Sequence, residues 1–390
     1  MTQEAIQVSV IMAVFNTRST LGAAIESVRL QSGITWELLI IDDHSTDGSW
    51  ELALQYAKAD PRIQALKTEG PKRCGGGGGR NTGLGAATGA TCMFLDGDDA
   101  YPPDTLRSLH AVLAENKSQV ARGLMTHFCK QRWLAGKPDF QGAPGSVNAF
   151  AMQSPVNAFT LYIYKMDLLR QNNVVFPENM GIGEDIAFLT QIHTLIDPKI
   201  PLLNKATYIY RINHKPVAPN GYKSKSFLHL VRHACALYEK AGMTEAKERF
   251  LRHFFLRDWL LRLQAPLAEN RESALAFLTD CMDIIAQNPF LQPDITQQLK
   301  GDSVRFLQAV ESRNAIVGLE ILEQAECITP LPFFMGIDRD TTTLSWHLYR
   351  ICRRFSSLAS PCFWRTIYYF SKLKRLSRRT LGKASAGDRS

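Results

Sequence analysis

The sequence lacks the features that define several common protein classes. Its eight cysteines are spread along 390 residues with no Cys-x-x-Cys pair, which fits neither a zinc site nor a disulfide framework. No stretch approaches the roughly eighteen uncharged apolar residues that a membrane-spanning helix needs. The first residues have neither the basic start nor the apolar run of a signal peptide. We therefore expect a reduced protein that stays in the cytosol and has no transmembrane helix.

Two nucleotide-binding motifs are also missing. A dinucleotide-binding oxidoreductase would carry Gly-x-Gly-x-x-Gly directly after its first strand, whereas the glycines here follow the third predicted strand. No Gly-x-x-x-x-Gly-Lys-Ser/Thr is present, so a P-loop nucleotidase is excluded as well.

Acidic residues are absent from most of the C-terminal tail. Ten Lys/Arg and no Asp/Glu lie between Trp346 and Lys383, so the formal charge of +8 belongs to this tail. A nucleic-acid-binding protein would carry its basic face on the folded domain, and we therefore expect no nucleic acid partner. Aromatic and aliphatic residues interleave with the basic ones, which is typical of a helix in the interface of an anionic bilayer. A helix packed on the rest of the protein, with its basic edge in water, would give the same pattern.

Short apolar runs alternate with amphipathic segments over the first hundred residues. Runs at 7–14, 36–41, 63–66 and 91–95 have the composition of buried strands, and helical spacing lies between them. The five consecutive glycines after Cys74 predict a flexible loop that feeds a small-residue helix. Alternating units of this kind predict a mostly parallel sheet with helices on both faces. Apolar spacing after Asn220 predicts a helical second domain.

Polar residues follow three of the predicted strands. Asn16 comes after the first strand, Asp42-Asp43 after the second, and Asp96-Gly-Asp-Asp99 after the fourth. In a parallel sheet, the carboxyl ends of the strands form the ligand-binding edge. Crowded carboxylates are commonly relieved by a divalent cation that also binds phosphate oxygens, so Asp96-x-Asp98 is a candidate nucleotide-metal site. An ordinary acidic turn, with Gly97 supplying backbone freedom, is the alternative.

A second pair of acids lies at the start of a predicted helix. A glycine-rich turn delivers Glu184 and Asp185 to the first helical turn. The helix dipole stabilises an acid at this place, so a simple capping role is open to either residue.

Five motifs together resemble the inverting family 2 glycosyltransferases of the GT-A fold. They are, in order, Val8–Asn16, Glu37–Asp47, Gly79-Arg80-Asn81 with Gly83 and Gly89, Phe94–Asp99 and Gly183–Leu189. The resemblance covers about residues 6 to 216. It departs at Ala13, where the family commonly has Pro, and at the five glycines, which would loosen a loop over the donor.

The resemblance implies an α/β fold: a Rossmann-like nucleotide-binding domain of the GT-A type, with a mostly parallel central sheet, followed by an α-helical C-terminal domain. Residues 1–105 would form the nucleotide-sugar-binding half of the GT-A domain, and 106–220 its acceptor-binding half. Residues 221–335 would form the helical domain, and 336–390 a basic amphipathic tail.

The resemblance also implies a role for each matching residue in binding a UDP-sugar. Asp43 would accept a hydrogen bond from the uracil imide, with Asp42 as a helper. The strand exit would line the base pocket, and Arg80 or Asn81 would hold the nucleotide from the loop. Asp96 and Asp98 would contact ribose and metal, with Asp99 as the most direct ligand of Mn²⁺ or Mg²⁺. The remaining nucleotide contacts are Val14, Phe15 and Asn16 at the base and Arg211 and His214 at the diphosphate.

Asp185 is the candidate general base, and Glu184 would orient the acceptor or cap the helix. One base opposite one leaving group gives a single displacement, so an α-linked UDP-sugar would yield a β-glycoside. We therefore expect a metal-dependent, inverting hexosyltransferase that acts on a saccharide or lipid-linked acceptor in surface glycan synthesis, such as lipopolysaccharide or capsule. Its place would be peripheral, on the inner face of the cytoplasmic membrane. A non-catalytic nucleotide-sugar-binding scaffold that keeps the fold is the alternative.

Overall fold

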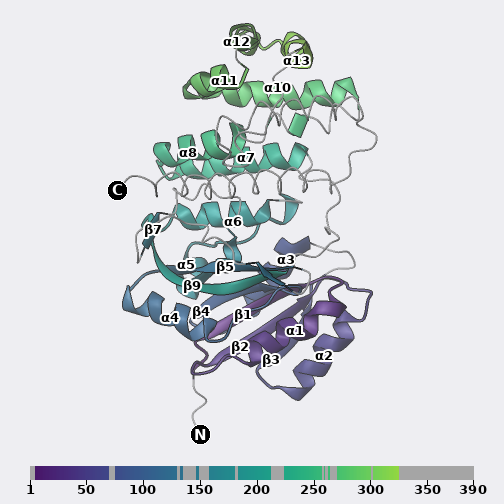
Figure 1. Ribbon diagram of the computed structural model, residues 1–390, viewed down its shortest axis with the longest axis vertical. Helices are drawn as coiled ribbons and strands as arrows, with labels where there is room; N and C mark the ends of the chain where they lie inside the picture. Colours follow the sequence, from purple (N-terminus) through teal and green to yellow (C-terminus); the bar gives the residue numbers. More distant parts are fainter. Residues whose placement is uncertain are drawn as a thin grey trace, which may run out of the picture.

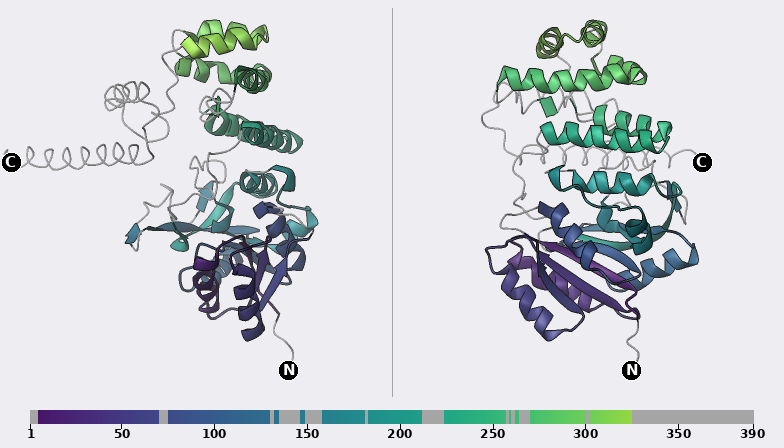
Figure 2. Two further views of the ribbon diagram at one scale, coloured as in Figure 1. Left: turned by 90° about the vertical axis from the view of Figure 1, so that its right-hand side faces the viewer. Right: turned by 180° about the vertical axis from the view of Figure 1, so that it is seen from behind.

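The computed structural model describes residues 5–69, 75–129, 132–134, 146–148, 158–180, 183–211, 224–256, 259, 262–263, 270–299 and 302–324. A lobe that contains the β-sheet lies at one end, and layers of helices are stacked on it towards the other end (Figures 1 and 2). The C-terminal tail and His214, to which the sequence analysis gave roles, lie outside the described residues.

The sheet has the mostly parallel arrangement that the sequence predicts. Its strands are β1 (Val8–Val14), β2 (Trp36–Asp42), β3 (Ile63–Lys67), β4 (Thr91–Asp96), β5 (Val120–Cys129), β6 (Arg132–Leu134), β7 (Ser146–Asn148), β8 (Tyr162–Lys165) and β9 (Lys199–Arg211). The order is β3-β2-β1-β4-β8-β5-β9-β7, with β6 paired to β5. Strands β1 to β4 pair in parallel, as do β5 and β9, whereas β8 runs antiparallel to β4 and β5.

Helices cover both faces of the sheet. They are α1 (Arg18–Arg29), α2 (Ser49–Ala59), α3 (Gly75–Ala86), α4 (Thr105–Glu115), α5 (Met166–Gln171) and α6 (Glu184–His193), with 3-10 turns η2 (Phe159–Leu161) and η3 (Glu178–Met180). Helices α1, α2 and α4 lie on one face, and α3 and α6 lie on the other (Figure 1). In α1 the buried residues recur at helical spacing; they are Leu21, Ala24, Ile25 and Val28.

The run of five glycines begins a helix, so the expected loop is wrong. Residues 75–79 are the first residues of α3. A Cβ on Gly83 of the same helix would lie 2.4 Å from Cγ2 of Ile11 in β1, and one on Gly79 would lie 3.7 Å from Cβ of Ala13. Small residues therefore let α3 lie directly on β1. This close packing outweighs the helix propensity of glycine, which is about 1 kcal/mol per residue worse than that of alanine.

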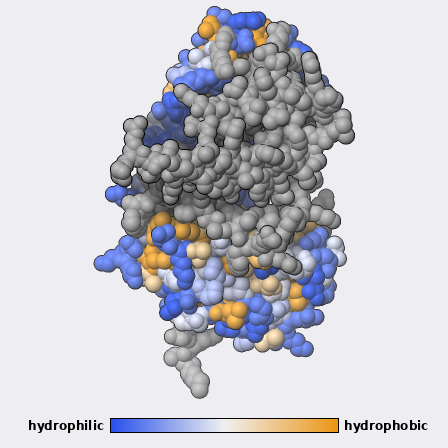
Figure 3. Space-filling view, in the orientation of Figure 1, coloured by the Kyte–Doolittle hydropathy of each residue, from blue (hydrophilic) through white to orange (hydrophobic). Residues whose placement is uncertain are grey.

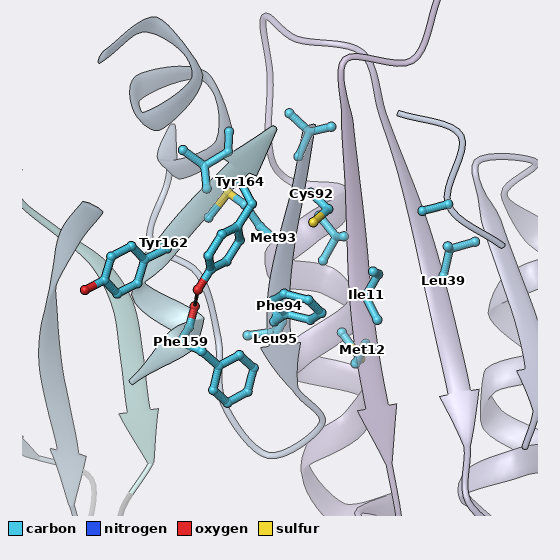
Figure 4. Packing of buried hydrophobic residues seen from close by; sticks show 14 of the residues in the cluster. Ile11, Met12, Leu39, Cys92, Met93, Phe94, Leu95, Phe159, Tyr162 and Tyr164 are labelled. Carbon is cyan, nitrogen blue, oxygen red and sulfur yellow. Dashed lines mark hydrogen bonds between the residues drawn. The ribbon is translucent and has the colours of Figure 1, made fainter. Parts of the chain in front are cut away.

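An aromatic cluster joins the tip of β4 to α6. The ring of Phe94 meets those of Phe159, Tyr164, Phe176 and Phe188 edge to face, with centroids 5.4, 5.8, 5.3 and 5.7 Å away. Figure 4 shows Phe94 beside Phe159, with the Tyr164 hydroxyl donating to the Phe159 carbonyl at 2.7 Å. Such pairs add roughly 0.5–1.5 kcal/mol each beyond their buried area. Phe94 lies two residues before Asp96, so the cluster supports the end of β4.

The helical layers have a core of their own. They comprise α7 (Ser224–Lys240), α8 (Thr244–Phe250), the π-helical turn η4 (Leu251–Phe255), α10 (Arg271–Gln287), the 3-10 turn η5 (Pro289–Leu291), α11 (Gln292–Leu299), α12 (Ser303–Glu311) and α13 (Ala315–Gln324). Their buried residues form a cluster separate from that of the sheet. A small third cluster of Met180, Ala187 and Leu230 joins α6 to α7. The predicted helical region that follows the sheet is therefore confirmed.

The described surface is mixed in character. No helix among the described residues is both long and apolar enough to cross a membrane. On the face shown in Figure 3, hydrophobic residues lie among hydrophilic ones, and some gather at the end formed by α12 and α13. Val304 and Ile316 of these helices are 63% and 56% exposed.

Candidate active site

The carboxyl ends of β1, β2 and β4 meet at one edge of the sheet, as the sequence predicts. In the register of the strands, Val14 of β1 lies beside Asp42 of β2, and Ala13 lies beside Asp96 of β4. The loops that follow these strands therefore start side by side.

Asp42 and Asp43 are buried at the end of β2. The Oδ1 atom of Asp43 accepts a hydrogen bond from the Thr68 hydroxyl at 3.0 Å, so the neighbouring strand orients this carboxylate. Asp42 Oδ2 accepts from the Ser45 N–H at 3.1 Å, whereas no described residue donates to its buried Oδ1. Because a buried acceptor without a donor is costly, this edge offers a place for the N–H group of a ligand.

Asn16 joins the loops that follow β1 and β2. Its backbone has a positive φ of 52°. Its side-chain oxygen accepts from the Thr46 N–H at 2.8 Å, and its own N–H donates to the Ser45 hydroxyl at 3.0 Å. These hydrogen bonds fix the exit of β1, where Val14 is buried and Phe15 is half-buried.

The acids that follow β4 form a tight turn. The N–H of Asp99 donates to the Asp96 carbonyl at 3.0 Å. At Gly97 a Cβ would lie 2.8 Å from Oγ1 of Thr17 and 3.2 Å from Cγ2 of Val14, so only glycine fits without a shift. The turn therefore packs directly on the start of α1.

Asp99 is held by the end of β9. It is 1% exposed, and its two carboxylate oxygens accept hydrogen bonds from the Tyr208 hydroxyl at 2.7 Å and the Arg211 N–H at 2.8 Å. The Tyr208 oxygen also accepts from the Asp96 N–H at 3.3 Å. Burial, together with the negative charges of Asp96 and Asp98, raises the pKa of Asp99 well above its usual range.

These carboxylates suit a divalent cation that a nucleotide helps to hold. Among the described residues, no group of three or more His, Cys, Asp or Glu is arranged to bind a metal ion. Mg²⁺-type sites in nucleotide enzymes often need only one or two carboxylates, because substrate phosphates supply other ligands. The half-buried Asp98 and the buried Asp99 offer such hard oxygen donors, and their mutual repulsion would be relieved by a cation.

Arg80 links the turn after β4 to the acid pair of α6. Its guanidinium lies 2.9 Å from Oδ1 of Asp96 and 3.4 Å from Oε1 of Glu184. Burial alone would lower the pKa of Arg80, but the charges of Asp96 and Glu184 outweigh it and raise that pKa. Two acid motifs that are 88 residues apart in the sequence thus meet at the buried guanidinium group of Arg80.

Asn81 is engaged by the segment that leads to α6. Its amide donates to the Phe176 carbonyl at 2.8 Å and to Glu178 at 3.0 Å, and its oxygen accepts from the Phe176 N–H at 2.8 Å. Arg80 and Asn81 both lie on helix α3. The side chain of each is hydrogen-bonded to other residues of the protein.

Asp185 lies in the first turn of α6, directly after Glu184. The helix begins after Gly183, whose φ of 96° is one that glycine adopts without strain. Burial, and secondly the charge of Glu184, raises the pKa of Asp185, while the Ile186 N–H and Arg80 oppose that rise. A carboxylate with a raised pKa is a stronger base than an ordinary aspartate, which suits a role in proton transfer.

Sequence reasoning missed two residues that hold the acids in place. Thr68 and Tyr208 act on Asp43 and Asp99 across 25 and 109 residues of sequence. The alternating pattern of the strand that ends at Arg211 was the only signal for Tyr208, because it places that side chain on the inner face. Arg211 is the last described residue of β9, and His214 lies outside the described residues.

Known proteins resemble this chain in both sequence and fold. Residues 9–172 match the family model described as Glycosyl transferase family 2. The chain is 27% identical over 282 residues to the succinoglycan biosynthesis protein ExoO of Rhizobium meliloti (strain 1021), covering 70% of this chain and 75% of ExoO. It is 38% identical over 109 residues to the Escherichia coli UDP-Glc:alpha-D-GlcNAc-diphosphoundecaprenol beta-1,3-glucosyltransferase WfgD, covering 28% of this chain and 42% of WfgD.

Among solved structures, S. aureus TarS 1–349 in complex with UDP-GlcNAc has a TM-score of 0.62 at 19% identity, covering 82% of this chain and 91% of TarS 1–349. The similarity in fold thus extends beyond the family match into the helical layers. The family match itself includes β1, β2 and β4 with the acids at their ends. Residues 9–172 therefore form a domain of the glycosyl transferase family 2 type, and the fold of the chain is of the GT-A type.

Proposed function

We propose that this glycosyltransferase moves a sugar from a UDP-sugar to a hydroxyl group of a saccharide or lipid-linked acceptor, with inversion, during surface glycan synthesis. The observation that carries the proposal is the meeting of the Asp96–Asp99 turn and the Glu184-Asp185 pair at Arg80. The relatives support it: the name of WfgD specifies UDP-glucose, a diphosphoundecaprenol acceptor and a β linkage, and TarS was solved with UDP-GlcNAc.

The uridine would lie at the ends of β1 and β2. Asp43 would accept a hydrogen bond from the uracil N–H, and the open Oδ1 of Asp42 is a second acceptor there. The exit of β1 at Val14, Phe15 and Asn16 would form the wall of the base pocket. Asp96 would bind the ribose.

The diphosphate would lie over the turn that follows β4. Asp98 and Asp99 would hold Mn²⁺ or Mg²⁺ there, and Arg211 and His214 would contact the phosphates. When bound, the cation offsets the negative charge that develops on the departing UDP.

Asp185 would take the proton from the acceptor hydroxyl as it attacks the anomeric carbon. Its place in the first turn of α6, directly after Glu184, and its raised pKa support this role. Glu184 would orient the acceptor. With a single displacement, an α-linked donor gives a β-glycoside.

The basic tail between Trp346 and Lys383 would attach the enzyme to the inner face of the cytoplasmic membrane, where lipid-linked acceptors lie. Its ten Lys/Arg, interleaved with aromatic residues, support attachment to an anionic surface.

A donor panel tests the proposal. The full chain is incubated with Mn²⁺ or Mg²⁺ and each of a set of UDP-, GDP- and dTDP-sugars, and release of the nucleoside diphosphate is measured. We expect release from one or more UDP-sugars, and a β-anomeric product by NMR once an acceptor is found. Preference for GDP- or dTDP-sugars would contradict the donor assignment, and an α product would contradict inversion.

A further inference from the structure

We propose that Arg80 is a positioning residue for Asp185: its guanidinium holds the acid pair of α6 at a fixed place beside the Asp96 turn, and it does not bind the nucleotide. This inference rests on the proposed function, since it assigns a new role within the same site.

The geometry leaves Arg80 little freedom to reach a phosphate. Its side chain is 11% exposed, and its two terminal nitrogens point to different carboxylates, Asp96 at 2.9 Å and Glu184 at 3.4 Å. The guanidinium carbon also lies 4.5 Å from the ring centre of Phe159 and 5.4 Å from that of Phe176. A planar fork that is stacked on rings and paired at both ends is rigid. To reach a diphosphate it would have to give up both ion pairs.

The glycine run supplies the space for this arrangement. A Cβ on Gly76 would lie 2.7 Å from Nη1 of Arg80, where the guanidinium folds back over the first turn of α3. A Cβ on Gly77 would lie 3.3 Å from Cβ of Phe176 and 3.4 Å from Cγ of Glu184. These glycines therefore let α6 pack closely on α3, and they let the Arg80 side chain fold over the start of its own helix. This packing accounts for a glycine motif that the sequence alone did not explain.

The charges around Asp185 give the positioning a chemical effect. Glu184, its neighbour on α6, favours the protonated form of Asp185, whereas Arg80 on α3 favours the ionised form. Asp96 at the tip of β4 faces Arg80 and fixes it. Loss of the Arg80 charge therefore leaves Asp185 harder to ionise, and a general base works only when it is ionised.

The test is Arg80→Met in the full chain, which keeps an apolar stem on the two rings and removes the fork. We expect kcat to fall about 10- to 100-fold, in the range typical for impaired general base catalysis. The acid limb of the kcat profile should move to higher pH. The affinity for UDP with Mn²⁺, measured by calorimetry, should fall by no more than about threefold, less than kcat, because Arg80 reaches the nucleotide site only through Asp96, whose N–H is also held by Tyr208.

Arg62→Met is the matched control. Arg62 also pairs with a carboxylate, Asp60 at 2.7 Å, and stacks on a ring, Trp36 at 3.9 Å. It lies just before β3, at the amino ends of the parallel strands, whereas the candidate site lies at their carboxyl ends. Its replacement should leave kcat, KM and the pH profile unchanged.

Two outcomes would overturn the inference. A loss of UDP affinity of tenfold or more, with kcat kept at saturating donor, would make Arg80 a nucleotide contact. Unchanged kinetics would leave it only a packing role. If Arg80→Met does not fold, Arg80→Lys is the test, because an ammonium group can pair with only one of the two acids. We expect this variant to have a several-fold lower kcat at unchanged UDP affinity. Weaker binding of UDP by Arg80→Lys would contradict the positioning role. Absence of transfer by the wild-type enzyme across the donor panel would instead refute the proposed function itself.

Discussion

Tyr208 shows how one buried hydroxyl can set the geometry of a turn from a distant strand. It donates to Asp99 at 2.7 Å and accepts from the Asp96 N–H at 3.3 Å, so it holds both ends of the turn that follows β4. Hydrogen bonds to charged groups contribute about 1.5–3 kcal/mol each. The carboxylates of this turn would thus be kept ready for a cation and diphosphate.

We therefore expect Tyr208→Phe to weaken the binding of UDP in the presence of Mn²⁺ by about tenfold, which corresponds to about 1.4 kcal/mol. Calorimetry with and without Mn²⁺ measures the effect. Tyr101→Phe is the control, because Tyr101 packs on Tyr208 with ring centres 6.0 Å apart but donates to the Phe94 carbonyl instead. An equal loss of affinity in both variants would indicate general loosening of the core.

Asp185→Asn removes the candidate base while keeping its shape. We expect kcat to fall at least about 100-fold, as for the loss of a general base, with UDP affinity nearly unchanged. Because the pKa of Asp185 is raised, the wild-type rate should increase with pH through a range above the ordinary aspartate value of 3.8. Steady-state rates from pH 4 to 8, with UDP titrations beside them, measure both effects. Equal loss of rate and UDP affinity would make Asp185 a structural acid.

At the scale of single residues, sequence patterns found the acids but not what holds them. Asp43, Asp99 and Asp185 could be selected because each follows a strand or starts a helix. Their supports come from far along the chain, as with Tyr208, and no local pattern marks such a partner. The ion pairs of Arg80 were missed for the same reason.

Helix α3 shows the balance between propensity and packing within one element. Gly85 is exposed, and a Cβ added there would meet no atom of the described residues within 4 Å, whereas a Cβ on Gly83 would come within 2.4 Å of Ile11. The same substitution should therefore have opposite effects at positions two residues apart.

We expect Gly85→Ala to raise the free energy of unfolding by about 0.5–1 kcal/mol through helix propensity. Gly83→Ala should lower it by about 1–3 kcal/mol, since overpacking against β1 outweighs the same gain. Urea unfolding of the two variants beside the wild type measures both. Stabilisation by Gly83→Ala would show that α3 can move away from the sheet at little cost.

The elements themselves were largely predictable. The strands at 8–14, 36–42 and 91–96 and the helix at 18–29 agree with their hydrophobic patterns, because buried strands and amphipathic helices follow simple periods. The glycine run was misjudged because local propensity favours a loop there. Its helical state depends on Ala13, Phe176 and Glu184, which are brought close only by the completed fold.

At the scale of the whole molecule, the helical layers were predictable as a class but their stacking was not. Apolar spacing indicates helices after residue 220, yet it cannot show that α7 packs on α6. The division into segments at 105, 220 and 335 stays a prediction. The buried core of the sheet is one cluster that includes both Val8 and Tyr208, so the two proposed halves of the GT-A domain share it.

The tail prediction concerns the location of the enzyme. The full chain should sediment with phosphatidylglycerol vesicles, and a chain that ends at Phe333 should stay in the supernatant, because the basic and aromatic residues are lost. High salt should release the full chain in part, since the attraction of basic residues to anionic lipid is screened. Vesicles of phosphatidylcholine are the control. Sedimentation of the shortened chain would place the lipid contact elsewhere.

The small cluster of Met180, Ala187 and Leu230 has a consequence for engineering this enzyme. Since α7 rests on the helix that starts with Asp185, a change of side-chain size on α7 could tilt that helix slightly and alter turnover while leaving donor recognition alone. Libraries aimed at new acceptors should therefore include remote positions such as Leu230 and not only the residues around the sugar.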